Sequence, residues 1–180
     1  MNTFVWDLRY PAATEVNGLR LGTTDDYSEY TYGPTIVPGT YTVVLDYGGK
    51  PSQQTFRVEL DPRLHPGPEA LAARLALATQ IHATLDSLNR TINAALAARQ
   101  RLSPQKRAQL DDVINGLVDF KVASDEGDVM FETQLRDQLG FLLNELDLAY
   151  QAPTTAESST YDTLRAEAEA AIAKLQALTQ

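Results

Sequence analysis

The sequence predicts an α+β protein with two segregated parts, a β-rich part over residues 1–63 and a helical part over residues 66–180. Two observations favour this class. Up to residue 60, apolar side chains recur at every second position among many Gly, Pro, Thr and Tyr residues, which is typical of strands and turns. Beyond residue 63 they recur at every third or fourth position, which is typical of amphipathic helices. We therefore expect the boundary between two small domains at residues 61–63.

A hairpin over residues 40–60 is the clearest element of the β-rich part. Residues 40–47 alternate as a half-buried strand does, and Gly48 and Gly49 suit a tight turn because glycine accepts positive φ. The return strand over residues 54–60 places its apolar side chains on one face. A further strand is expected over residues 4–10 and a shorter one over residues 18–21.

Four helices are predicted in the second part. The first spans about residues 69–100, and Ser103 and Pro104 provide the N-cap and first position of the second. A third apolar stripe runs from residue 131 to 149. Thr154 and Glu157 have the spacing of a capping box at the start of the fourth helix. Because the connections are short, we expect neighbouring helices to be antiparallel and to form a helical bundle of about four helices.

Composition argues against several classes of partner and site. The formal charge is −9 and no basic face is evident, so nucleic acid and anionic membrane surfaces are not expected partners. The chain has no cysteine, and its two histidines are isolated, so we predict no catalytic residue, no cofactor and no metal site. No apolar run has the length of a membrane helix.

For Asp7 and Arg9, solvent exposure or an interdomain salt bridge is the expectation.

One stretch suits ligand binding, because aromatic side chains alternate with carboxylates. Aromatic rings stack on the apolar faces of sugars, and carboxylates accept hydrogen bonds from sugar hydroxyl groups. The alternative interpretation is a Tyr-rich loop that covers the sheet or packs on a neighbouring domain. The candidate ligand-binding residues are Asp25, Asp26, Tyr27, Glu29, Tyr30 and Tyr32.

Two short motifs are interpreted as structural. Residues 125–128 lack the ligand spacing of a calcium-binding loop, and Asp128 is expected to cap the following helix. Asn89 begins a glycosylation sequon, but the sequon lies in the middle of a predicted helix and is taken as a chance match.

Several motifs of the β-rich part occur together in a recognisable order. They are residues 4–11 (FVWDLRYP), Gly18-Leu19, Gly33-Pro34, residues 38–43 (PGTYTV) and residues 61–63 (DPR). In this order they resemble the C-terminal region of bacterial sortilin-like, BNR-repeat β-propeller proteins, which are often labelled glycosyl hydrolases. The resemblance covers residues 4–63, whereas residues 22–32 depart from the family's pattern. It implies an Ig-like β-sandwich and a helical tail that follow a large propeller.

The function expected from this resemblance is a non-catalytic accessory or interaction module. The predicted strand at residues 4–10 begins almost at Met1, and a complete Ig-like sandwich needs about seven strands. We therefore expect a C-terminal fragment of a larger exported protein, whose propeller would carry any glycoside hydrolase activity. The fragment itself carries no export signal. Expected partners are the upstream propeller, another protein or a glycan, and a second copy paired through an exposed sheet edge. A carbohydrate-binding module is the alternative function.

Overall fold

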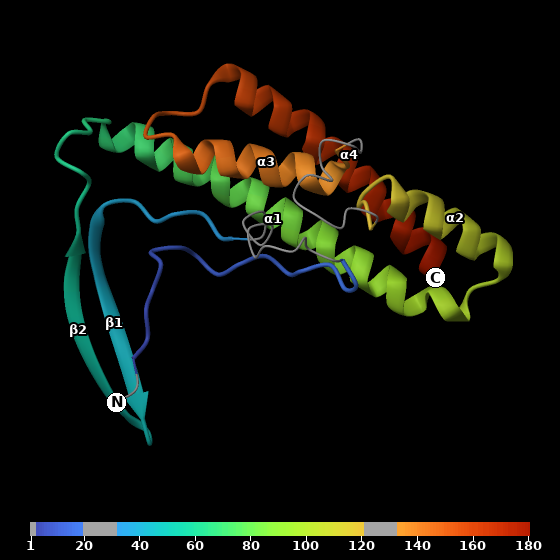
Figure 1. The fold of residues 1–180 in the computed structure, drawn as a ribbon, viewed down its shortest axis with the longest axis horizontal. Coiled ribbons are helices and arrows are strands. Elements are labelled where there is room, and N and C mark those ends of the chain that lie inside the picture. The colour runs from blue at the N-terminus through green and yellow to red at the C-terminus, as the bar shows by residue number, and fades with distance from the viewer. Residues whose placement is uncertain (1–2, 20–31, 121–132) are drawn as a thin grey trace.

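The computed structural model describes residues 3–19, 32–120 and 133–180 and has a mixed α+β architecture (Figure 1). In the described residues, a two-stranded antiparallel sheet precedes four α-helices, which confirms the predicted mixed α+β class. The elements are β1 (Gly39–Tyr47), β2 (Lys50–Val58), α1 (Pro68–Ala98), the short 3-10 helix η2 (Arg99–Arg101), α2 (Pro104–Asn115), α3 (Leu135–Leu148) and α4 (Thr155–Thr179).

The predicted hairpin is confirmed, and it projects away from the helices (Figure 1). Gly48 and Gly49 have φ angles of 60° and 76°, so the turn requires a conformation that glycine adopts at little cost. Tyr41 lies opposite Phe56, and Trp6 packs edge-on against both rings at centroid distances of 5.9 and 6.1 Å. This aromatic cluster covers the base of one face of the hairpin.

The strand predicted over residues 4–10 is reduced to a single bridge between Arg9 and Thr35. Leu8 has a φ of 64°, a left-handed conformation that costs a non-glycine residue roughly 1–2 kcal/mol and interrupts an extended strand. The strand predicted over residues 18–21 is also not observed where it is described, because Gly18 lies in a turn. Within its described residues, the β-rich part thus contributes one hairpin and one bridge.

The four helices pack as three roughly antiparallel rows, which we call columns, because α2 and α3 lie one after the other (Figure 1). Helix α1 forms the first column, α2 and α3 follow one another in the opposite direction, and α4 returns parallel to α1. At 1.5 Å per residue, α1 is about 46 Å long, which neither α2 nor α3 alone can match. The second column is therefore built from two shorter helices, so the four helices are not equivalent members of a bundle.

One hydrophobic core joins the three columns. Its fully buried members each contribute roughly 1.5–3 kcal/mol through loss of water contact. The largest of them are Ile81, Leu85, Leu88, Ile92, Leu110, Leu139, Leu146 and Leu175.

The predicted helix starts are observed as caps. Ser103 accepts a hydrogen bond from the Lys106 amide at the start of α2. At the start of α4, Thr154 and Glu157 form both hydrogen bonds of a capping box. The N-cap predicted at Asp128 lies outside the described residues.

An extended segment, residues 13–17, lies along α1, and we call it the strap. Its amides, carbonyls and one hydroxyl bind Asp86, Asn89 and Asn93, whose spacing places them on one face of the helix. Asn89 is fully buried and donates to the Thr14 carbonyl at 2.7 Å. The glycosylation sequon is therefore inaccessible in the folded protein.

We predict that Thr154→Ala destabilises the protein by about 1 kcal/mol, because the Glu157 amide loses its capping partner. The free energy of urea unfolding measures this loss. Thr163→Ala is the matched control, since Thr163 is exposed within α4 and its hydroxyl bonds only the Ser159 carbonyl. Equal losses in the two variants would contradict the capping role.

Candidate functional site

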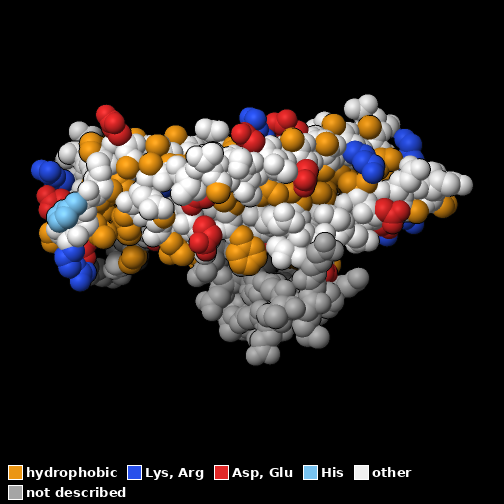
Figure 2. All heavy atoms as spheres, turned by 90° about the horizontal axis from the view of Figure 1, so that it is seen from above, with side chains coloured by type: hydrophobic (Ala, Val, Ile, Leu, Met, Phe, Trp, Pro, Cys, Tyr) orange, Lys and Arg blue, Asp and Glu red, His pale blue; other side chains and the backbone are white. Residues whose placement is uncertain are grey.

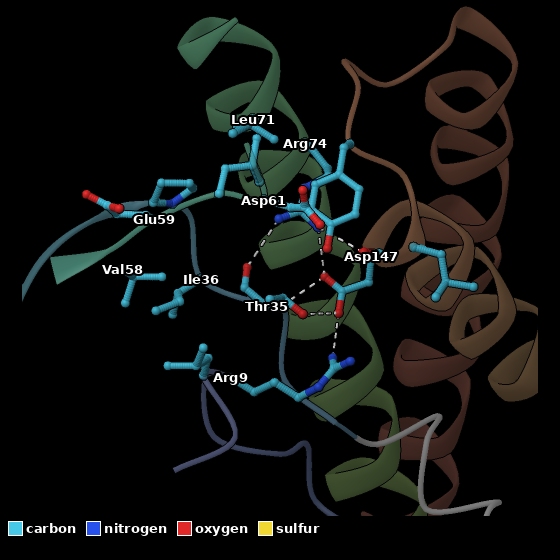
Figure 3. A pocket seen from close by; sticks show the side chains of 14 residues that line it. Arg9, Thr35, Ile36, Val58, Glu59, Asp61, Leu71, Arg74 and Asp147 are labelled. Atoms are coloured by element: carbon cyan, nitrogen blue, oxygen red, sulfur yellow. Dashed lines mark hydrogen bonds and ion pairs between the residues drawn. The ribbon is translucent and has the colours of Figure 1, made fainter. Parts of the chain in front are cut away.

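Four segments that are distant in the sequence meet at one buried carboxylate, Asp147, near the C-terminal end of α3 (Figure 3). Arg9 comes from the N-terminal segment, Thr35 from the segment that leads into β1, and Arg74 from the first two turns of α1. Only 4% of the Asp147 side chain and 3% of the Arg74 side chain are exposed. We call these four residues the Asp147 junction.

Both oxygens of the Asp147 carboxylate are bonded. Oδ2 accepts from Arg9 Nη1 at 2.5 Å and from the Thr35 hydroxyl at 2.6 Å. Oδ1 accepts from the Thr35 amide at 2.9 Å and from Arg74 Nη1 at 3.1 Å. Charge-assisted bonds in a dry site are stronger than exposed ones, so this carboxylate ties the β-rich part to α1 and α3.

Arg74 bonds backbone as well as side chain. Its Nη1 also donates to the Asp147 carbonyl at 3.2 Å, and its Nη2 reaches the Thr35 carbonyl at 3.5 Å. Arg9 likewise donates to the Gly33 carbonyl at 3.1 Å. Of the two roles expected for Arg9, the structure shows an ion pair, with Asp147 of the helical part as its partner.

Gly33 is required by close backbone packing beside the junction. A Cβ built on it would lie 2.1 Å from the Tyr10 carbonyl oxygen and 2.5 Å from that of Pro11. The neighbouring backbone pairs tightly, since the Tyr10 amide donates to the Pro34 carbonyl and the Ile36 amide to the Leu8 carbonyl. A side chain at residue 33 would separate the two segments.

A pocket of about 310 Å³ opens beside the junction, between the base of the hairpin and α1. Apolar side chains from both parts form much of its wall, including Ile36, Val58 and Leu71. Its carboxylates all have cationic partners: Asp147 binds Arg9 and Arg74, Asp61 binds Arg63, and Glu59 binds Arg57. Besides these carboxylates, the described polar residues of its wall include Thr35 and Tyr150.

Of the predicted sugar-binding residues, only Tyr32 lies among the described residues. Asp25, Asp26, Tyr27, Glu29 and Tyr30 lie outside the described residues. Tyr32 is described and is 39% exposed, with the Arg9 guanidinium carbon 5.5 Å from its ring centroid. It lines a hollow of about 210 Å³ together with Asn144 and Leu148.

A second surface stands out because apolar side chains remain exposed on it. The side chains of Val43, Leu45 and Tyr47 are on the same face of the hairpin as the Trp6 cluster, and they are 52%, 67% and 85% exposed. We call these three residues the apolar hairpin face. Their partners on β2 are Gln54, Ser52 and Lys50, and the opposite face carries Val44 and Pro51 among threonine, glutamine and charged residues. Phe4 and Val5 are exposed as well.

On the helical part, the exposed large apolar side chains include Phe141 and Leu148 of α3. On the face seen in Figure 2, acidic and basic side chains are scattered among apolar and uncharged ones, and no continuous basic patch is formed. No helix in the described part of the chain combines the length and the apolar character that a bilayer span requires. Among the described residues, no three His, Asp or Glu side chains are grouped closely enough to hold a metal ion.

Sequence reasoning missed three of the four junction residues. One signal was available for Arg74, which occupies a position between Leu71 and Ala78 on the buried stripe of α1. A charged residue at such a position needs a buried partner. Nothing in the sequence identified Asp147 as that partner, because the two residues are far apart along the chain.

No protein-family model, curated protein or solved structure matches this chain.

We predict that Asp147→Asn destabilises the protein by about 3 kcal/mol or more, because two guanidinium groups lose their buried counter-charge. Urea unfolding followed by circular dichroism measures the loss. Asp162→Asn is the control: its ion pair with Arg165 is exposed, so the expected change is within about 0.5 kcal/mol. Similar losses in both variants would refute the role of Asp147 as the anchor.

Asp86 makes the attachment of the strap sensitive to pH. Burial acts to raise the pKa of this carboxyl, but hydrogen bonds from Thr14 and Arg90 outweigh burial and lower the pKa below its usual 3.8. The carboxylate therefore stabilises the fold fully above pH 3.8, and its contribution is lost as the pH falls through the lowered pKa.

We predict that Asp86→Asn lowers the free energy of unfolding by about 1–2 kcal/mol at neutral pH. The difference from the unsubstituted chain should shrink in strong acid, because the native carboxyl is then protonated as well. Unfolding titrations at neutral and acidic pH measure this trend. A difference that is independent of pH would show that the charge of Asp86 does not hold the strap.

Proposed function

We propose that this protein is a non-catalytic interaction module and that the hairpin is its binding element. One observation carries the proposal: the apolar hairpin face has the alternating pattern of a buried strand face, yet Val43, Leu45 and Tyr47 are exposed. An isolated two-stranded sheet is only marginally stable in water. A further layer against this face would remove apolar surface from water and stabilise the hairpin.

The Asp147 junction supports this role because it holds the base of the hairpin in place. It fixes the segment that leads into β1 to both α1 and α3, so the base of the hairpin has a defined position. Trp6 packs on Tyr41 and Phe56 and so supports the hairpin just beyond its base. A binding element held in this way loses less conformational freedom on association than a flexible loop would.

The partner that we propose is the remainder of a larger parent protein. The sequence motifs of residues 4–63 resemble the Ig-like segment that follows a β-propeller in exported sortilin-like, BNR-repeat proteins. In this proposal, strands that precede Phe4 in the parent pack on the apolar hairpin face and complete an Ig-like sandwich. In this proposal, any glycoside hydrolase activity belongs to the propeller, because the carboxylates of the pocket beside Asp147 are all paired with arginines.

The proposal predicts that charges on the apolar hairpin face block association without unfolding the module. Leu45→Lys with Tyr47→Lys should change the unfolding free energy by less than about 0.5 kcal/mol, because both side chains are already exposed. The same pair should reduce binding of the upstream part of the parent, added as a separate chain, by at least about tenfold. Isothermal titration calorimetry measures the binding.

Thr42→Lys with Thr55→Lys is the matched control, since these residues face each other on the opposite, polar side of the hairpin. If both pairs of substitutions weaken binding equally, the apolar hairpin face is not the interface. Binding of a glycan panel that is lost on Tyr32→Ala would instead favour the carbohydrate-binding alternative. Hydrolysis of a glycoside by the purified 180-residue chain would overturn the non-catalytic assignment.

A further inference from the structure

We propose that the outer edge of β1 pairs with the β1 strand of a second copy of this chain. The two strands would be antiparallel, with Val43 of one copy opposite Val43 of the other on a two-fold axis. This inference goes beyond the proposed function, because it concerns the edge of the hairpin and not its apolar face. Each hairpin would contribute two strands to a four-stranded sheet.

The backbone groups that point outward along β1 can be assigned from the register. Tyr47 and Lys50 flank the two-residue turn and form a hydrogen-bonded pair, so hydrogen-bonded pairs recur at every second position. Asp46 and Pro51 then form a non-hydrogen-bonded pair, which explains why a proline without an N–H is tolerated in β2. The outward-facing residues of β1 are therefore Thr40, Thr42, Val44 and Asp46.

This edge has little protection against pairing. Natural edge strands are usually blocked by proline, by bulges or by several charges, whereas Asp46 is the only charged residue of β1. In the described chain, no backbone hydrogen bond joins residues 3–7 to β1, although Trp6 packs on its face. The left-handed φ of Leu8 interrupts the extended backbone between residues 3–7 and the bridge at Arg9.

The strand is self-complementary in the proposed register. With Val43 on the axis, Thr42 pairs with Val44, Thr40 with Asp46 and Tyr41 with Leu45 of the other copy. All outward-facing residues then fall in hydrogen-bonded pairs. The two apolar hairpin faces merge into one continuous surface, because the side-chain alternation is the same in both strands.

The position of Asp46, the charged residue of β1, is compatible with this pairing. The two Asp46 side chains lie at opposite ends of the paired strands and do not face each other. Each lies on the polar face directly opposite Thr40 of the other copy, and Arg57 lies beyond Thr40 on the next strand. The aspartate and the arginine are thus two strands apart, about 10 Å between backbones, so salt weakens their attraction.

The pairing also determines where the two helical parts would lie. The hairpin projects from the helices, so antiparallel strands place the two helical parts at opposite ends of the sheet (Figure 1). Two strands bury less surface than the roughly 800 Å² per partner of a standard interface. We therefore expect a weak dimer, with a Kd in about the micromolar to millimolar range.

Sedimentation equilibrium of the 180-residue chain tests the dimer across a wide concentration range. Val44→Pro removes an outward N–H and should weaken self-association by about tenfold or more. Gln53→Pro is the matched control, because it makes the same change on the outer edge of β2. A chain that stays monomeric at millimolar concentration, or equal effects of the two prolines, would overturn the proposal.

Cysteine cross-linking tests the register without a change to the backbone. The chain has no cysteine, so Val43→Cys introduces a single thiol. Opposite residues of a non-hydrogen-bonded pair have Cα atoms about 4.5 Å apart, so mild oxidation should give disulfide-linked dimers. In the same register the two residues at position 45 are about 13 Å apart, so Leu45→Cys should not cross-link. Equal cross-linking of both variants would refute the register.

Discussion

The buried carboxylate of Asp147 is the constraint on which the arrangement of the two parts depends. It binds side chains from the N-terminal segment and α1 together with the backbone of the segment that leads into β1. A carboxylate that is 4% exposed is tolerable only when its oxygens are hydrogen-bonded and its charge is balanced. Meeting that requirement with Arg9 and Arg74 determines where the β-rich part attaches to the helices.

The strap follows the same physical logic along α1. An extended segment has unpaired amide and carbonyl groups, and the polar side chains of Asp86, Asn89 and Asn93 satisfy several of them. At the same time, Ala13 and Val16 contribute apolar surface to the core. The first helix therefore serves two purposes, since one stripe packs against the other helices and a neighbouring polar stripe holds the N-terminal segment.

The hairpin contrasts with the Asp147 junction and the strap, where buried side chains bind the backbone of other segments. Its base is supported by Trp6, Tyr41 and Phe56, whereas the side chains nearer the turn are exposed and β1 has an open edge. A strand face and a strand edge offer different contacts, since the face excludes water and the edge donates and accepts backbone hydrogen bonds. The proposed sheet layer and the proposed second copy would thus occupy different parts of one element.

The sequence by itself determined the local structure. Periodicity and caps located the hairpin, the four helices and the starts at Ser103 and Thr154, because these features depend on residues that are close along the chain. It could not locate Asp147, nor show that α2 and α3 share a column, because these depend on contacts between distant residues. It also predicted a strand at residues 4–10, whereas backbone geometry at Leu8 and the pairing of Arg9 with Thr35 left a single bridge. Tertiary structure decided these points, since ion pairing and packing outweigh local propensity when buried groups must be satisfied.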